Sequence, residues 1–396
     1  MGAARHAPHP ALVLFALSVG AFAIGTTEFA SMSLLPFFAR DLGIDAPTAG
    51  HAISAYALGV VTGAPLIAAF GARLPRRTLL IALMSVFAAA NALSGLSPSY
   101  HWMLLFRFLS GLPHGAYFGV AALVAASLVP LEKRTLAIAK VMTGLTVATV
   151  IGVPVANWMG QTLGWRSGFF VVAVLALATV TLVAAFAPRD AGDPDASPLR
   201  ELTALGKPQV WLTLLTGAIG FGGLFAVYTY VASTMIEVTR VPESYVPFML
   251  IVFGLGMTIG NLAVAWAADR ARNPTVIGVL LWSAGALALF PLMAGNIWTL
   301  GIIIFLIGIG GGLGTPLQAR LMDVSGDAQT LAAALHHSAF NVANALGPWL
   351  GGLSIAAGYG LGSTGWIGAA LALGGLVIFL CAIALERRRA TFALAQ

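Results

Sequence analysis

The hydrophobic residues of this chain fall in long unbroken runs, separated by short polar turns that often carry glycine or proline. A helix that crosses the hydrocarbon core of a bilayer needs roughly 20 such residues. The pattern therefore predicts an all-α membrane protein with about twelve transmembrane helices. The predicted spans are 11–38, 48–71, 78–97, 102–128, 136–160, 166–187, 209–236, 245–268, 275–294, 298–318, 329–354 and 364–385.

The composition agrees with this interpretation. Of the 396 residues, 59% are hydrophobic and only 9% are charged, whereas an ordinary soluble domain carries about 25% charged residues. So few charges cannot cover the surface of a soluble fold. The composition thus excludes a water-soluble enzyme, a disordered chain and a nucleic-acid-binding domain, and leaves a polytopic membrane protein whose outer surface faces lipid.

The basic residues predict the orientation. With an even number of spans both termini lie on one side, and nearly all Lys and Arg residues fall in loops or termini of that side. Only Arg40, Arg166 and Arg240 fall in opposite loops, and Arg107 falls inside a span. By the positive-inside rule both termini are cytoplasmic. The net charge of +6 then reports topology rather than a nucleic-acid partner.

The longest polar stretch, 188–208, lies midway along the chain, and the halves on either side resemble each other at a shift of about 195 residues. FLSGLPHG (108–115) matches FLIGIGGG (305–312), and TLA at 135–137 matches TLA at 330–332. We therefore expect two pseudo-symmetric six-helix bundles, 1–187 and 209–396, joined by a cytoplasmic linker. Such repeats are typical of secondary transporters, whose substrate site lies near the midplane between the halves.

Two charged residues stand out because they lie inside spans. Glu28 is the only carboxylate deep within a span, and Arg107 is the only basic residue there; Gly111 and His114 share its helical face. We expect this face to meet Glu28 and to form a proton-coupling site of Glu28, Arg107 and His114. The alternatives are a static buried ion pair and, for His114, a plain hydrogen bond to a neighbour.

Other polar residues form sparse stripes on the predicted spans. They are candidates for the lining of a cavity between the halves, and interhelical hydrogen bonding explains each of them equally well. The single cysteine, Cys381, forms no intrachain disulfide and is interpreted as a buried small hydrophobe. The cavity candidates are Thr143, Thr146, Asn157, Tyr228, Tyr230, His337, Asn341 and Asn344.

The motifs of catalysis and of ATP hydrolysis are missing from the sequence. None of the three lysines lies in a phosphate-binding GxxxxGK[ST] loop, and neither HExxH nor GxSxG occurs. The adjacent histidines at 336 and 337 point in different directions on a helix, which makes a poor metal pair. We expect no enzymatic activity, no metal and no cofactor; the energy source would be the proton gradient.

The chain resembles the major facilitator superfamily, and within it the twelve-helix drug:proton antiporters of the arabinose-efflux-permease-like branch. GTTEF (25–29) with LLP (34–36) resembles that branch's first-helix signature. The other matching segments are RFLSGLPHGAYFGV (107–120), GVPVANWMGQTLGWRSGFF (152–170) and LHHSAFNVANALGPWLGG (335–352). The resemblance implies proton transfer at Arg107 and an antiporter motif that contains Gly144, Gly152 and Pro154.

One loop departs from the family pattern. The family carries Asp-Arg and then Gly-Arg-Arg/Lys between helices two and three, and here Ala72 and Pro75 replace the aspartate and the glycine. Of this motif Arg73, Arg76 and Arg77 remain, and the second half retains Asp269-Arg270. We expect these arginines and the Asp269-Arg270 pair to combine gating of the conformational change with setting the orientation.

Together these observations predict a proton-coupled antiporter of the bacterial inner membrane that exports a small neutral or amphipathic solute, such as a drug, sugar or nucleoside. The partners are the solute, protons and the bilayer, and the resemblance implies a monomer. The alternative transport function is proton-coupled import of a small solute such as a sugar. A membrane enzyme or sensor is the third possibility, without a visible catalytic constellation.

Overall fold

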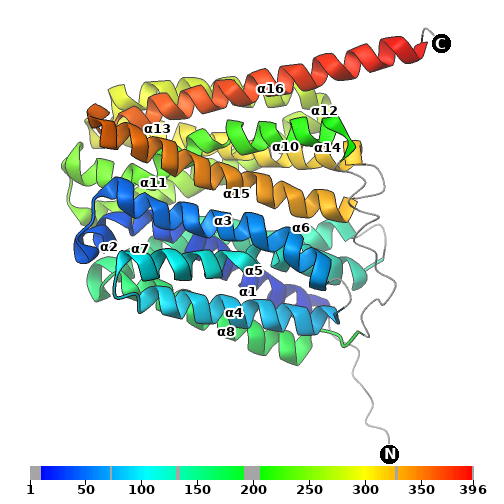
Figure 1. The fold of residues 1–396 in the computed structure, drawn as a ribbon, viewed down its shortest axis with the longest axis horizontal. Coiled ribbons are helices and arrows are strands. Elements are labelled where there is room, and N and C mark those ends of the chain that lie inside the picture. Colours follow the sequence, from blue (N-terminus) through cyan, green and yellow to red (C-terminus); the bar gives the residue numbers. More distant parts are fainter. Residues whose placement is uncertain (1–9, 72–73, 131–133, 191–205, 326–328, 395–396) are drawn as a thin grey trace, which may run out of the picture.

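The computed structural model describes residues 10–71, 74–130, 134–190, 206–325 and 329–394. Within these residues the chain is helical and forms no β-strand. Figure 1 shows the helices lying side by side in one elongated bundle, with α1–α8 in one half and α10–α16 in the other. The described chain begins and ends at the same end of this bundle, and α2 lies at the opposite end.

The first half contains one helix or helix pair for each predicted span. The hydrophobic run predicted as the single span 11–38 divides at Leu34, because α2 restarts there with a proline in its first turn. The helices are α1 (Pro10–Ser33), α2 (Leu35–Leu42), α3 (Ala46–Gly71), α4 (Arg76–Gly95), α5 (Tyr100–Ser127), α6 (Arg134–Val147), the π-helix η2 (Ala148–Gly152), α7 (Val153–Leu163) and α8 (Arg166–Phe186).

The second half follows the same order with more interruptions. Glycines at 310–312 tighten one predicted span into a 3₁₀ turn, and Phe221 divides another. The elements are α10 (Pro208–Gly220), α11 (Gly222–Glu237), η4 (Glu243–Tyr245), α12 (Val246–Met293), α13 (Ile297–Ile309), η5 (Gly310–Leu313), α14 (Gly314–Ser325), α15 (Gln329–Ser354), η6 (Ile355–Tyr359) and α16 (Ser363–Leu394).

Ten helical segments of the described chain are long and apolar enough to cross a membrane. One of them, Glu243–Met293, contains two crossings, because the backbone of α12 leaves the helical region at Ala271. The 26-residue helix α15 lies beside α3 in the bundle although it is not among the ten. The described residues therefore contain the twelve membrane-length helices that the sequence predicts.

Glycines allow the same close packing in both halves. A Cβ on Gly59 or Gly63 of α3 would lie 2.1 Å from a carbonyl oxygen of α5. A Cβ on Gly256 or Gly260 of α12 would lie 2.4 or 2.2 Å from a carbonyl oxygen of α13. The two pairs differ by 197 positions, and small residues of this kind let membrane helices approach closely. This correspondence supports the internal duplication.

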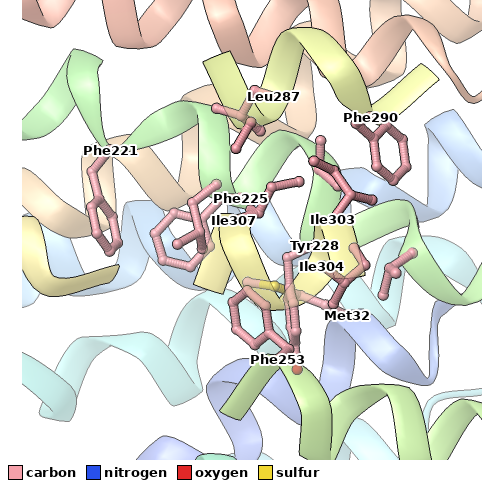
Figure 2. Close-up of a cluster of buried hydrophobic side chains, with 14 of the residues drawn as sticks. Met32, Phe221, Phe225, Tyr228, Phe253, Leu287, Phe290, Ile303, Ile304 and Ile307 are labelled. Atoms are coloured by element: carbon pink, nitrogen blue, oxygen red, sulfur yellow. The ribbon is translucent and has the colours of Figure 1, made fainter. Parts of the chain in front are cut away.

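The apolar core is divided in the same way. One buried cluster belongs to α1, α3–α6 and α8, and a second one to the C-terminal helices. Figure 2 shows part of the second cluster, where Met32 of α1 lies among C-terminal residues such as Tyr228 and Phe253. The interface between the halves is therefore partly apolar.

Away from this interface, Cys381 is exposed on α16, so its interpretation as a buried hydrophobe is wrong.

Candidate functional site

Glu28 lies at the interface between the two halves. It is buried on α1, with 8% of its surface exposed, and its Oε1 accepts a hydrogen bond of 3.1 Å from Nδ2 of Asn344 on α15. Asn344 itself is fully buried. The sequence singled out both residues, as a proton-coupling residue and a cavity residue, but it did not pair them. The structure thus joins a membrane-embedded carboxylate of one half to an amide of the other.

Arg107 lies on α5 against the same helix as Glu28 but contacts different residues. Its guanidinium donates to Oγ1 of Thr27 at 3.2 Å and to Oγ of Ser31 at 3.1 Å, and lies 4.3 Å from the ring centroid of Tyr56. In the described part of the chain Glu28 and Arg107 form no ion pair. The expected α5 face does meet α1, but the alternative of a static Glu28–Arg107 ion pair is wrong for this structure.

His114 belongs to a second contact between the halves. Its Nδ1 lies 2.9 Å from the hydroxyl of Tyr56 on α3, and its ring centroid is 6.4 Å from that of His337 on α15. The ring of Phe118, one turn further along α5, stacks on His337 with a centroid separation of 5.0 Å. Tyr56 therefore lies between Arg107 and His114, and this polar cluster extends to the second half through His337.

The remaining cavity candidates separate into groups. Asn157 is buried, donates to the backbone oxygen of Ser33 and so holds α7 on α1. Tyr230 donates to the backbone oxygen of Pro348, and a Cβ on Gly50 of α3 would lie 2.4 Å from its hydroxyl, so it helps to pack the halves together. The other candidates are Tyr228, in the apolar interface beside Phe29; Asn341, whose Nδ2 donates to the backbone oxygen of His337; Thr143, exposed on α6; and Thr146, half-buried.

The segment implied to be an antiporter motif forms a bend. Pro154 follows the π-helix η2, as expected where a proline removes a backbone donor from a helix. A Cβ on Gly144 would lie 2.1 Å from the backbone oxygen of Ser18, and one on Gly152 would lie 2.3 Å from Oγ1 of Thr26. The two glycines therefore set how closely α6 and η2 approach α1. Across the interface, η2 packs on α12.

The basic residues expected to gate the transporter are arranged differently in the two halves. Arg73 lies outside the described residues. The backbone N–H of Arg76 donates to Asp190, and the guanidinium of Arg77 donates to the backbone oxygen of Ala184 at the end of α8. In the other half Arg270 lies over the ring of Trp266 and donates to its backbone oxygen.

Asp269 forms no ion pair within the described residues, and the gating role expected for the Asp269-Arg270 pair stays a prediction. The ion pairs at this end of the second half are Arg272–Asp323 and Arg320–Glu386. Arg320 is 4% exposed and also donates to side chains of α10 and α12. Sequence reasoning missed its role because Arg320 lies near the predicted end of a span and looked like one more orientation charge.

The end of the bundle opposite the termini carries further polar links. Arg40 and Glu243 join the halves by an ion pair of 2.8 Å, and Gln161 donates to the backbone oxygen of Glu243. Within the first half, hydrogen bonds from the Arg166 guanidinium and the Trp165 ring lower the pKa of Asp41 below its ordinary value of 3.8. Trp165 is itself buried, with 4% of its surface exposed.

Helices of membrane length in two related bundles, with a polar site at their interface, define a secondary-transporter fold. A sequence profile of the Major Facilitator Superfamily matches residues 17–270 and 230–395. The chain is 40% identical to the inner membrane transport protein YdhP of Escherichia coli K12 over 93% of its own length and 95% of that protein. The chain belongs to the Major Facilitator Superfamily.

Other relatives and solved structures agree. The putative transporter AraJ of Escherichia coli K12 is 35% identical, over 87% of this chain and 88% of AraJ. A chloramphenicol resistance protein of Streptomyces lividans is 35% identical, over 85% of this chain and 87% of that protein. By fold, the chain resembles the nucleoside transporter NupG, with a TM-score of 0.71 and 13% identity over 93% of this chain and 99% of NupG. It also resembles an inward-facing bacterial Spinster homologue, with a TM-score of 0.68 and 18% identity over 97% of this chain and 96% of that one. The chain is thus a multi-pass membrane transporter of bacterial type, with relatives named for resistance and transport.

Proposed function

We propose that this transporter is a proton-coupled antiporter that exports a small neutral or amphipathic solute by alternating access. The observation that carries the proposal is the hydrogen bond between Glu28 and Asn344, because it places a titratable carboxylate on the boundary that must open and close. A buried ionisable group in a membrane is costly, and in transporters such groups mark ion pathways. Efflux is supported further by the relative named for chloramphenicol resistance.

The coupling follows from the chemistry of this contact. A hydrogen bond to an ionised carboxylate is roughly twice as strong as one between neutral groups. When Glu28 takes up a proton, the link to Asn344 weakens and the halves separate more easily. When Glu28 loses the proton, Asn344 is held again. Arg107, bound to Thr27 and Ser31 beside Glu28, supplies a positive charge that favours proton release, and His114 exchanges protons through Tyr56.

The same proposal includes the topology. The basic loops put both termini in the cytoplasm, and the halves comprise residues 1–187 and 209–396, with 188–208 as the linker; positions 191–205 of that linker lie outside the described residues. The remaining polar candidates line the path of the solute, and Arg76, Arg77 and Arg270 adjust the cytoplasmic ends of the helices. The protein acts as a monomer in the inner membrane.

The test is Glu28→Gln, which keeps the size and the acceptor oxygen but removes the titration. In proteoliposomes with an imposed pH gradient we expect the variant to lose solute-dependent proton flux while the amount of folded protein is unchanged. Glu237→Gln is the matched control, since Glu237 lies exposed at the end of α11. Wild-type flux in Glu28→Gln would refute the coupling role.

Import is the second transport function, and the direction of solute movement separates the two. Cells that express an exporter should hold less of a labelled solute than control cells, and a protonophore should abolish the difference. Accumulation that collapses with the protonophore would instead show a symporter. No structural observation favours the symporter.

A further inference from the structure

We infer that Asn91 of α4 is a positioning residue for proton coupling. Through the hydroxyl of Thr27 it holds the guanidinium of Arg107 on α1, away from the carboxylate of Glu28. This inference rests on the proposed coupling role of Glu28 and adds α4 to the site. It depends on three observations: an ordered series of hydrogen bonds, the burial of its members, and the residues at the corresponding positions of the second half.

The side-chain amide of Asn91 has one allowed orientation. Its Nδ2 donates to the backbone oxygen of Phe87, one turn earlier on α4, at 2.9 Å. With the amide turned over, two oxygens would face each other without a proton between them. Oδ1 therefore faces α1, where it lies 2.7 Å from Oγ1 of Thr27. Because an amide oxygen only accepts hydrogen bonds, the hydroxyl of Thr27 must donate its proton to Asn91.

This committed proton leaves the lone pairs of Thr27 to Arg107. Nη1 of Arg107 donates to Oγ1 of Thr27 at 3.2 Å. Ser31 is oriented in the same way, because its hydroxyl donates to the backbone oxygen of Glu28 at 3.2 Å and accepts from Nη2 of Arg107 at 3.1 Å. A guanidinium only donates, so it needs two such acceptors. One of them is oriented by α1 itself and the other by Asn91.

The series is shielded from water, which makes each of its bonds matter. Asn91 is fully buried, Arg107 is 1% exposed, and Thr27 and Ser31 are 2% exposed. Without Asn91 the hydroxyl of Thr27 would turn to a carbonyl of its own helix, as threonine hydroxyls in helices do. Its oxygen would then leave the guanidinium. A buried guanidinium that loses an acceptor is drawn to a nearby carboxylate.

That carboxylate is Glu28. The charged or titratable groups that face it within the described residues are Arg107 of α5 and Tyr56 of α3, while α15 presents the neutral amide of Asn344. An arginine within about 4–6 Å of a carboxylate favours its ionised form. An ion pair with Arg107 would therefore keep Glu28 ionised. By keeping the guanidinium on the two hydroxyls, Asn91 leaves Glu28 able to take up a proton.

The second half supports a joint role of these residues. At the shift of 197 positions that relates the matched glycines, all three members of the series are replaced by apolar residues. The pairs are Thr27 and Leu224, Asn91 and Ala288, and Arg107 and Ile304. A residue needed only for helix packing has no reason to change together with the arginine. The joint replacement is expected if the asparagine and the threonine serve the guanidinium.

The protonation of Glu28 can be followed without solute and without a gradient. Infrared difference spectra of the purified full chain in nanodiscs, recorded over a pH titration, show the C=O band of protonated carboxyl groups. The part of the band that is missing in Glu28→Gln belongs to Glu28. We expect Asn91→Leu, which keeps the branched shape but forms neither hydrogen bond, to move the midpoint of this band to lower pH by about one unit or more.

An unchanged midpoint in Asn91→Leu overturns the inference. A Glu28 band that does not titrate in the wild type between about pH 4 and 10 overturns it as well. Thr27→Val is the second variant, and it decides the question if Asn91→Leu does not fold. It should move the midpoint in the same direction, whereas Thr27→Ser, which keeps the hydroxyl, should restore the wild-type midpoint.

Two combinations separate positioning from a plain structural role. Asn91→Leu with Thr27→Val should move the midpoint no further than the larger single change, because both break one series of bonds. With Arg107→Ile in the background, Asn91→Leu should not move it. Ser94→Ala is the matched control, since the Ser94 hydroxyl is equally buried on α4 and donates to its own helix. Additive shifts, or a shift without the arginine, contradict the assignment.

The titration and the transport assay of Glu28→Gln fail separately. A midpoint that moves in Asn91→Leu, together with wild-type proton flux in Glu28→Gln, would keep the positioning of Arg107 and remove the antiporter. An unmoved midpoint, together with loss of flux in Glu28→Gln, would keep the antiporter and remove the positioning role of Asn91.

Discussion

The two halves of this transporter use the same backbone packing around different chemistry. In the first half Gly59, Gly63 and Gly111 bring α3 and α5 together, and Gly256, Gly260 and Gly308 do the same for α12 and α13, 197 positions later. At the same shift Arg107 corresponds to Ile304 and His114 to Gly311. The contact geometry is the same in both halves, whereas the buried arginine at this position is present in the first half alone.

The difference shows how little of the interhelical geometry depends on polar residues. Tyr56, under the guanidinium of Arg107, corresponds to Phe253, which lies in the apolar cluster of Figure 2 together with Ile304. An apolar residue thus fills the position of Arg107 without loss of packing. The proposed proton-coupling role would account for the cost of burying Arg107 and its neighbours.

The largest effect is expected when the charge is placed in the wrong half. Ile304→Arg would bury a guanidinium in the apolar cluster that contains Phe253. We expect a loss of stability of at least about 3 kcal/mol, since an uncompensated buried charge is strongly destabilising. Fluorescence-detected gel filtration of the membrane extract should show aggregated or degraded protein. A monodisperse variant would mean that the second half contains a concealed polar site.

The converse change should leave the fold intact. Arg107→Ile copies the second half, and we expect a folded protein that loses at most about 1–2 kcal/mol, because Thr27 and Ser31 each lose one hydrogen-bond partner and the Tyr56 ring loses the guanidinium over it. Proton-coupled transport in proteoliposomes should fall below detection. Arg107→Lys, which keeps the charge but not the planar donor geometry, should retain part of the transport. Full transport by Arg107→Ile would show that proton-coupled transport does not need this buried charge.

Substitution of the matched glycines should affect both halves alike. Gly59→Ala and Gly256→Ala each place a Cβ within 2.1–2.4 Å of a carbonyl oxygen, so we expect each to destabilise the protein by about 1–3 kcal/mol through overpacking. Gly119→Ala and Gly285→Ala, where a Cβ meets nothing within 4 Å, are the controls and should be neutral or slightly stabilising. Thermal denaturation in detergent measures all four. A large asymmetry between Gly59→Ala and Gly256→Ala would contradict the shared geometry.

The smallest expected effect is a pH dependence confined to the first half. The pKa of Asp41 is lowered mainly by hydrogen bonds from Arg166 and Trp165, so its stabilisation is present above the unfolded pKa and is lost as the pH falls through the folded one. In the second half a neutral bond, from the Thr239 hydroxyl to the backbone oxygen of Ala294, links the ends of α11 and α12. The melting temperature of the wild type should therefore exceed that of Asp41→Asn near pH 7, and this difference in melting temperature should shrink at pH below about 4.

Thr239→Val tests the other half of that comparison. Because its bond carries no titratable group, the difference in melting temperature between this variant and wild type should not change with pH over the same range. A pH-dependent difference in melting temperature for Thr239→Val, or a constant difference for Asp41→Asn, would show that charge does not distinguish the Asp41 contact from the Thr239 contact.

The sequence was most informative where the bilayer itself imposes the pattern. The spans and their number follow from the need for apolar side chains against lipid, and the similarity of the halves was visible in matching segments. Glu28 and Arg107 were identifiable because charge is otherwise excluded from the spans. The breaks at Leu34, Phe221 and η2 were harder to place, since a hydrophobic run carries no mark of a local change in helix type. By contrast, the break in α12 at Ala271 falls in the polar turn between the predicted spans 245–268 and 275–294.

The tertiary structure decided which of these residues meet. Two charges at similar depth suggest an ion pair, yet Arg107 contacts Thr27 and Ser31 while Glu28 contacts Asn344, because rotation of each helix about its axis directs the side chains. Similarly, the sequence singled out the adjacent Asp269 and Arg270, whereas the buried Arg320 makes the ion pair to α16. The exclusion of charge from the spans identifies the candidate residues of a site. The partners across the interface depend on distances between segments more than 300 residues apart, which no local pattern encodes.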